Sequence, residues 1–103
     1  MLPKKNRLPR EAFRARGYRA VATPFFSIKI KNNTLGGNRI GVIIGKSVDK
    51  RATRRNFLER QTKSLLLKMP DNREDVIVTI FPKANLLFKK QFAEEIKKTL
   101  KKF

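Results

Sequence analysis

The stretch DVIVTIF, residues 75–81, is apolar at nearly every position, so a strand formed here would bury both of its faces. Strands of that kind lie inside a sheet and have neighbours on both sides. Pro82 ends the strand, because proline lacks the N–H that a sheet ladder needs. We therefore predict that residues 75–81 form the central strand of the fold.

An amphipathic helix is predicted on each side of this strand. Before it, a buried stripe at helical spacing runs to about residue 69 and comprises Leu58, Thr62, Leu65, Leu66 and Met69. After it, residues 87–102 carry one apolar row made of Phe88, Phe92, Ile96 and Leu100. Each helix is expected to lay its apolar side on the sheet.

The N-terminal half predicts two more strands and a short helix. From Pro24 the pattern alternates, with Phe26, Ile28 and Ile30 on one face. Residues 39–45 are expected to be its hairpin partner, across the Asn- and Gly-rich turn 32–38. A short helix is expected from Pro9 to about residue 16, behind a basic, flexible arm at residues 1–9. The result is one domain, residues 1–103, of the α+β class, with one small sheet and the order α-β-β-α-β-α.

The charge balance points to a polyanionic partner. Lys and Arg number 26 against 8 Asp and Glu, and the formal net charge is +18. The chain has no Cys and no His, so disulfides, thiolate zinc sites and imidazole catalysis are excluded. It has no apolar run of the roughly 18 residues that a membrane span needs. We expect a cytoplasmic protein that binds no membrane and no small-molecule substrate.

Two enzymatic interpretations are rejected, one on the spacing of its motif and one for lack of a carboxylate cluster. GVIIGKS, residues 41–47, resembles the end of a phosphate-binding loop, but its glycines are one residue too close together. A two-metal nuclease needs clustered carboxylates, and Asp71, Glu74 and Asp75 are better explained as turn and strand-flanking residues. We therefore predict no catalytic residue and no metal ligand in the protein.

The basic stretch KRATRRNFLER, residues 50–60, begins the first long helix. Thr53, Asn56, Arg60 and Lys63 fall on one polar face, opposite the buried stripe. Arg51, Arg54 and Arg55 surround its N-terminal end. Arg binds phosphate in a bidentate way and Asn bonds base edges or sugars, so this face suits RNA. Arg55 and Asn56 are expected on the exposed side, whereas Phe57 either stacks on a base or completes the core.

A second candidate surface lies on the mixed side of the first predicted strand. It combines the ring of Phe25, the hydroxyl of Ser27 and the cation of Lys29, with Phe13 of the short helix nearby. Aromatic rings among cations are typical of grooves that bind single-stranded nucleic acid. The alternative is a half-exposed sheet face that the short helix covers.

The order of these segments resembles the protein subunit of bacterial ribonuclease P over nearly the whole chain. The matching motifs, in chain order, are Asn6-Arg7-Leu8 with Phe13, Arg39-Ile40-Gly41-Val42 with Lys46, Ala52 with Arg55, Asn56 and Arg60, and Asp75-Val76-Ile77-Val78. Two positions depart from the family: Phe57 replaces an Arg and Glu59 replaces a Lys. The short helix is also about half a turn shorter than the family's.

The resemblance implies a function and a fold. The family's catalytic RNA removes the 5′ leader of precursor tRNA by hydrolysis with Mg²⁺, which is held mainly by the RNA. The protein, inactive alone, would be a subunit of this endonuclease.

The resemblance also assigns residues. By resemblance, the RNA subunit is contacted by Arg55, Asn56 and Arg60, with Arg51 and Arg54 beside them. Phe13, Phe25, Ser27, Lys29 and Lys63 are assigned to the leader. The family's fold is a ribosomal-protein-like sandwich with a left-handed β-α-β crossover. A ribosomal protein and a protein-only nuclease remain the alternatives.

Overall fold

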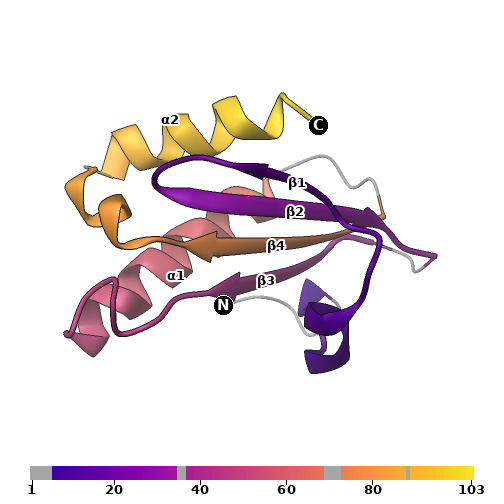
Figure 1. Ribbon diagram of the computed structural model, residues 1–103, viewed down its shortest axis with the longest axis horizontal. Coiled ribbons are helices and arrows are strands. Elements are labelled where there is room, and N and C mark those ends of the chain that lie inside the picture. The colour runs from indigo at the N-terminus through magenta and orange to yellow at the C-terminus, as the bar shows by residue number, and fades with distance from the viewer. Residues whose placement is uncertain (1–5, 35–36, 69–72, 88) are drawn as a thin grey trace.

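The computed structural model describes residues 6–34, 37–68, 73–87 and 89–103. Its elements, in chain order, are the 3-10 helix η2 (Arg10–Arg14), the strands β1 (Arg19–Ala22), β2 (Phe26–Asn32) and β3 (Arg39–Ile43), the helix α1 (Ala52–Leu67), the strand β4 (Glu74–Ile80), the 3-10 helix η3 (Pro82–Leu86) and the helix α2 (Lys89–Leu100). The α+β class and the single small sheet are confirmed (Figure 1).

The sheet has the strand order β1-β2-β4-β3, so β4 is an inner strand as predicted. The predicted hairpin is wrong: β3 pairs in parallel with β4, and β2 pairs instead with β1, a strand that was not foreseen. RAVA, residues 19–22, is short and mostly exposed, and this leaves little hydrophobic pattern to detect. The predicted order of elements therefore lacked this strand.

The connection from β3 through α1 to β4 is the parallel crossover. In Figure 1, β3 and β4 run leftward, β4 lies above β3, and α1 lies behind the sheet. This arrangement makes the crossover left-handed, as the resemblance implied and against the usual right-handed rule.

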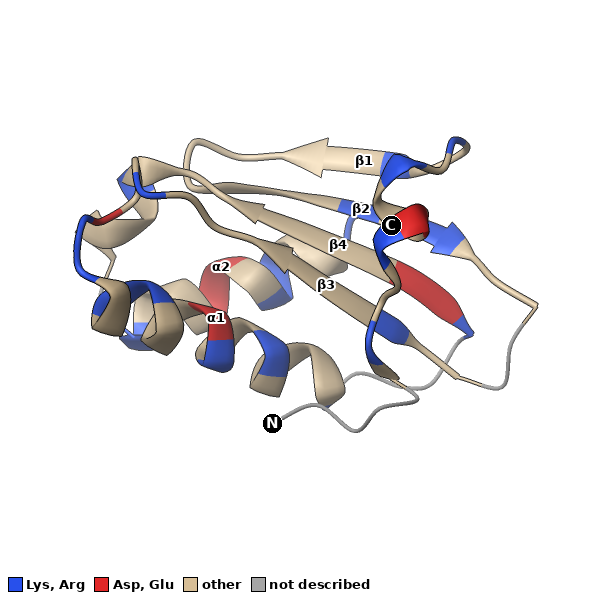
Figure 2. Cartoon of the chain, turned by 90° about the horizontal axis from the view of Figure 1, so that it is seen from below, with Lys and Arg blue, Asp and Glu red and all other residues tan. Residues whose placement is uncertain are grey.

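The main core lies between the sheet and its two helices, which cover the same face (Figure 2). Phe26 of β2 and Phe92 of α2 meet edge to face, with ring centroids 5.8 Å apart. The buried stripe of α1 includes Leu58, Thr62 and Leu66 as predicted. Met69 and Phe88, which were also assigned to helix stripes, lie outside the described residues.

The opposite face of the sheet is only partly covered. Leu8, Ala12 and Ile77 form a small second core there, with Phe13 and Tyr18 packed against it. A Cβ at Gly41 would overlap the Phe13 ring, so glycine lets this ring lie directly on β3. The predicted short helix is a single 3-10 segment, and Gly17 follows it at φ 92°, a conformation that favours glycine.

The N-terminal arm is not free along its whole length. Residues 1–5 lie outside the described residues, but Arg7 forms a parallel bridge with Ile40 at the β3 edge. The Leu8 N–H donates to the Ile40 carbonyl at 3.1 Å, and the Asn6 side chain donates to the Asn38 carbonyl at 2.8 Å. Residues 6–8, which were assigned to the flexible arm, are therefore attached to the sheet.

Candidate nucleic-acid interface

The N-terminal end of α1 is fixed by arginines that hydrogen-bond within the protein. The Arg51 guanidinium and backbone N–H bond the carboxylate of Asp49 and lower the pKa of that carboxyl to about 2. One Arg55 nitrogen donates to the carbonyls of Asp49 and Lys50, at 2.9 and 3.1 Å. Arg55 is thus half-buried and supports the loop before α1, contrary to the expectation that it lies on the exposed side.

Arg54 connects α1 to η3. Its Nε donates to Oδ1 of Asn85 at 3.3 Å, and the Asn85 side chain donates in turn to the Val48 carbonyl. The Arg54 guanidinium also lies 5.4 Å from the centre of the Phe57 ring. Three of the five residues predicted to contact the RNA subunit, Arg51, Arg54 and Arg55, therefore hold the loop that leads into α1.

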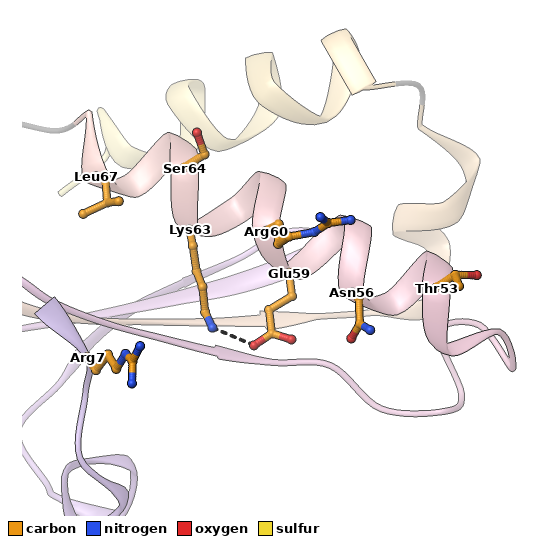
Figure 3. A pocket seen from close by; sticks show the side chains of 8 residues that line it. All are labelled: Arg7, Thr53, Asn56, Glu59, Arg60, Lys63, Ser64 and Leu67. Carbon is orange, nitrogen blue, oxygen red and sulfur yellow. Dashed lines mark hydrogen bonds and ion pairs between the residues drawn. The ribbon is translucent and has the colours of Figure 1, made fainter. Parts of the chain in front are cut away.

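The other two predicted residues line an open groove, here called the Arg7 groove (Figure 3). It lies between α1 and the N-terminal segment and is lined by Arg7, Thr53, Asn56, Glu59, Arg60, Lys63, Ser64 and Leu67. Asn56 and Arg60 are exposed. Neither makes a hydrogen bond or an ion pair with the rest of the described chain, so both are available to an external ligand.

Lys63 lies in this groove and not with the sheet residues that were assigned to the leader. Its ammonium pairs with the carboxylate of Glu59 at 2.7 Å, one turn earlier on α1. Among the described residues, Glu59 is the only acid that lines the Arg7 groove. The carboxylate of Glu59 thus neutralises one of the cations that line this groove.

The open face of the sheet carries Ser27 and Lys29. Lys29 pairs in register with Ile77, and Ser27 with Thr79, so all four side chains share the face that η2 partly covers. Phe13 packs on this face, as predicted. Phe25 precedes β2 and packs against the main core on the helix side, so it does not continue the Ser27–Lys29 row.

The five residues assigned to the leader therefore occupy three places. Phe13, Ser27 and Lys29 share the open face, Phe25 adjoins the main core, and Lys63 lies in the Arg7 groove. The alternative of a covering helix holds in part, because η2 covers the sheet over Ile77. The side chains at Ser27 and Thr79 are half-buried, and Lys29 is exposed.

The carboxylates near β4 serve ion pairs. Asp75 accepts two bonds from the Arg39 guanidinium, at 2.8 and 2.7 Å, and one from Asn33 at 2.9 Å. Burial alone would raise the pKa of Asp75, but these donors outweigh it and lower the pKa. Glu74 pairs with Arg19 at 3.4 Å. Within the described residues, no three His, Cys, Asp or Glu side chains gather as metal ligands would.

Sequence reasoning missed Arg7 and Ser64 as residues of the groove. Arg7 belongs to a motif that the sequence displayed, but its position opposite α1 depends on the parallel bridge to Ile40. A bridge between segments so far apart in the sequence leaves no periodic pattern that could predict it.

Across the part of the chain that the structure describes, no helix is both long and apolar enough to cross a bilayer.

Comparison with known proteins identifies a family for this chain and solved structures with the same fold. A family model described as Ribonuclease P matches residues 2–103. The RNase P protein of Staphylococcus aureus superposes with a TM-score of 0.82 at 22% identity, over 93% of each chain. The RNase P protein from Thermotoga maritima gives a TM-score of 0.76 at 19% identity, over 94% of this chain and 96% of its own. No curated protein sequence matches the chain. At these identities the superpositions establish the fold.

Proposed function

Because this chain belongs to the ribonuclease P family and is a protein component of that ribonucleoprotein, we propose that it binds the catalytic RNA through α1. The observation that carries the proposal is the Arg7 groove, where Asn56 and Arg60 are exposed and have no partner in the described chain. Charged donors facing phosphate form hydrogen bonds about twice as strong as neutral ones. The net charge of +18 adds a long-range attraction.

The arginines at the start of α1 have a second part in this proposal. Arg51, Arg54 and Arg55 hold the loop before α1, and their guanidinium groups keep their charge while doing so. They fix the helix that presents Asn56 and Arg60, and they add positive potential at its N-terminal end. Direct contact with the RNA subunit is proposed for all five residues, with Asn56 and Arg60 as the principal ones.

We further propose that the 5′ leader of precursor tRNA lies on the open face of the sheet. Lys29 is exposed there beside Ser27, and Phe13 offers a ring at the same face. A phosphate on Lys29 and a base against Phe13 would reproduce the usual grip on a single strand. Phe25 and Lys63, which lie elsewhere, would act on the leader only from the borders of this face.

The hydrolysis itself is assigned to the RNA subunit. Mg²⁺ would supply Lewis-acid chemistry in the holoenzyme, held mainly by RNA phosphates. Four of the protein's carboxylates, those of Asp49, Glu59, Glu74 and Asp75, are each engaged with an Arg or Lys, and no three acids gather as metal ligands within the described residues. The protein's part in the cytoplasmic holoenzyme is to bind and orient RNA and to ease its requirement for Mg²⁺.

One assay separates this proposal from its alternatives. Cleavage of a precursor tRNA is measured with the protein alone, the RNA subunit alone, and both together at limiting Mg²⁺. We expect cleavage at the 5′ end only when RNA is present, and faster cleavage when the protein is added. Cleavage by the protein alone would indicate a protein-only nuclease, and no stimulation would favour a ribosomal or other RNA-binding role.

A further inference from the structure

A second groove lies on the other side of α1, between α1 and α2, and is here called the interhelical groove. It is lined by Phe57, Arg60, Gln61, Ser64, Leu65, Lys68, Lys89, Lys90 and Ala93. Four of these residues are cations and none is an acid. Cations that gather without counter-charges repel one another, so a groove of this composition is stabilised by an anion.

The cations come from both helices. Arg60 and Lys68 lie on α1, whereas Lys89 and Lys90 form the start of α2. The Gln61 side chain donates to the Lys89 carbonyl at 3.0 Å and so joins the two helices at this point. The Lys89 and Lys90 ammonium groups are exposed and make no ion pair within the described residues. The positive end of the α2 helix dipole adds to the same potential.

The groove also has an apolar side. Phe57, Leu65 and Ala93 are each half-buried and line it between the cations. Phe57 does not belong to the main core cluster, so its ring is left to line the groove. Arg54 lies over its ring. Cations beside an aromatic ring are what proteins use to hold a single nucleic-acid strand, with phosphates on the cations and a base or sugar on the ring.

We propose that the interhelical groove is a binding site for the backbone of single-stranded RNA. Arg60 and Ser64 line both grooves, and Figure 3 shows Ser64 on the opposite side of α1 from Asn56 and Lys63. A strand that leaves the Arg7 groove over Arg60 would therefore pass directly into the interhelical groove. The proposal rests on the proposed RNA-binding function and extends its surface from α1 onto α2.

The test uses the full chain and a single-stranded oligouridylate of about 12 nucleotides, a length within the site sizes of single-strand-binding domains. Lys89→Ala/Lys90→Ala is compared with Lys98→Ala/Lys102→Ala, which removes the same charge from exposed positions that line neither groove. We expect the first pair to lower the log–log salt slope by about 1.4, or about 0.7 for each lost phosphate contact. The control pair should leave the slope unchanged.

Phe57→Leu keeps an apolar side chain and removes the ring, and it should weaken oligouridylate binding by at least about fivefold. Thermal midpoints of all variants verify that each is folded. Equal slopes for the two lysine pairs, no effect of Phe57→Leu, or tighter binding of a duplex of the same length would each overturn the proposal. Stimulation of precursor-tRNA cleavage is measured in parallel. If it persists while the groove variants bind oligouridylate normally, only this inference fails and the proposed function stands.

Discussion

Some of the residues whose motifs identify the family stabilise the fold of this protein. Arg39 and Asp75 belong to separate motifs, and they face each other across the parallel β3–β4 pair. Asp75 is 5% exposed, and its two oxygens accept from the Arg39 guanidinium at 2.8 and 2.7 Å. The two motifs are therefore joined by one ion pair, which sequence alone did not connect.

Arg39→Ala should destabilise the fold by about 3 kcal/mol, because removing one partner leaves a buried carboxylate uncompensated. We take the lower end of the usual range because the Arg39 side chain is 20% exposed. Arg19→Ala is the control: its pair with Glu74 is longer, at 3.4 Å, and its side chain is 59% exposed. That change should cost about 0–1 kcal/mol. Equal losses in urea unfolding would contradict the account of this pair.

Asp75→Asn should make stability depend less on pH. The pKa of Asp75 is lower in the folded state than its ordinary value of 3.8, so its ion pair stabilises the fold above that value. The stabilisation is lost as the pH falls through the folded-state pKa. The wild-type advantage over Asp75→Asn in free energy of unfolding should thus shrink from about pH 6 to about pH 3. An advantage that stays constant over this range would show that the charge of Asp75 is unimportant.

Arg55 and Asn56 should respond differently to replacement by Ala. Arg55→Ala removes a charged donor from the Asp49 and Lys50 carbonyls and should cost about 1.5–3 kcal/mol of stability. Asn56 is exposed and unpaired in the described chain, so Asn56→Ala should change stability by less than about 0.5 kcal/mol. Asn56→Ala should still weaken binding to the RNA subunit. Thermal midpoints and affinities, measured side by side, would refute this if Asn56→Ala unfolded the protein or left the affinity unchanged.

At the scale of elements, strong periodicity was a reliable guide and pairing was not. The stripe through Leu58 and Leu66 located α1, and the doubly apolar run located β4. The prediction that β3 forms a hairpin with β2 was wrong. Strands that are neighbours in a sequence usually form hairpins, whereas here the chain passes from β3 through α1 to β4, and β3 pairs with β4. The polar face and the buried stripe of this helix correctly predicted that Asn56 and Arg60 are exposed on α1. The structural role of Arg55 could not be predicted from the sequence, because it depends on hydrogen bonds to the carbonyls of Asp49 and Lys50 in the loop before α1.

Glu59→Gln tests the electrostatics of α1. The change removes the acid found among the described lining residues of the Arg7 groove and releases Lys63 from its ion pair. RNA-subunit affinity should rise, and the log–log salt slope should steepen by about 0.7–0.9 for one added phosphate contact. Loss of the pair should cost the helix only about 0.3–0.5 kcal/mol. Glu94→Gln, at an exposed site on α2 outside both grooves, is the control. If it has the same effect, net charge alone explains the change.

At the scale of the whole molecule, the two faces of the sheet have different uses. One face is closed by α1 and α2 over the main core, and the other is left partly open beyond η2. The helices that close the first face turn their polar sides outward, where the Arg7 and interhelical grooves lie. The charge of +18 was evident from the sequence, but its division among these surfaces required the fold.

The central claim is that this protein binds RNA through α1 and leaves the chemistry to its RNA subunit. The most direct measurement is precursor-tRNA cleavage at limiting Mg²⁺, with the RNA subunit and increasing amounts of wild type or of Asn56→Ala/Arg60→Ala. The variant should need about 100-fold more protein for half-maximal stimulation, since two lost contacts are together worth about 3 kcal/mol. At high Mg²⁺ both reactions should become equally fast. Full stimulation by the variant at wild-type concentrations would contradict the claim, and so would cleavage by the protein without RNA.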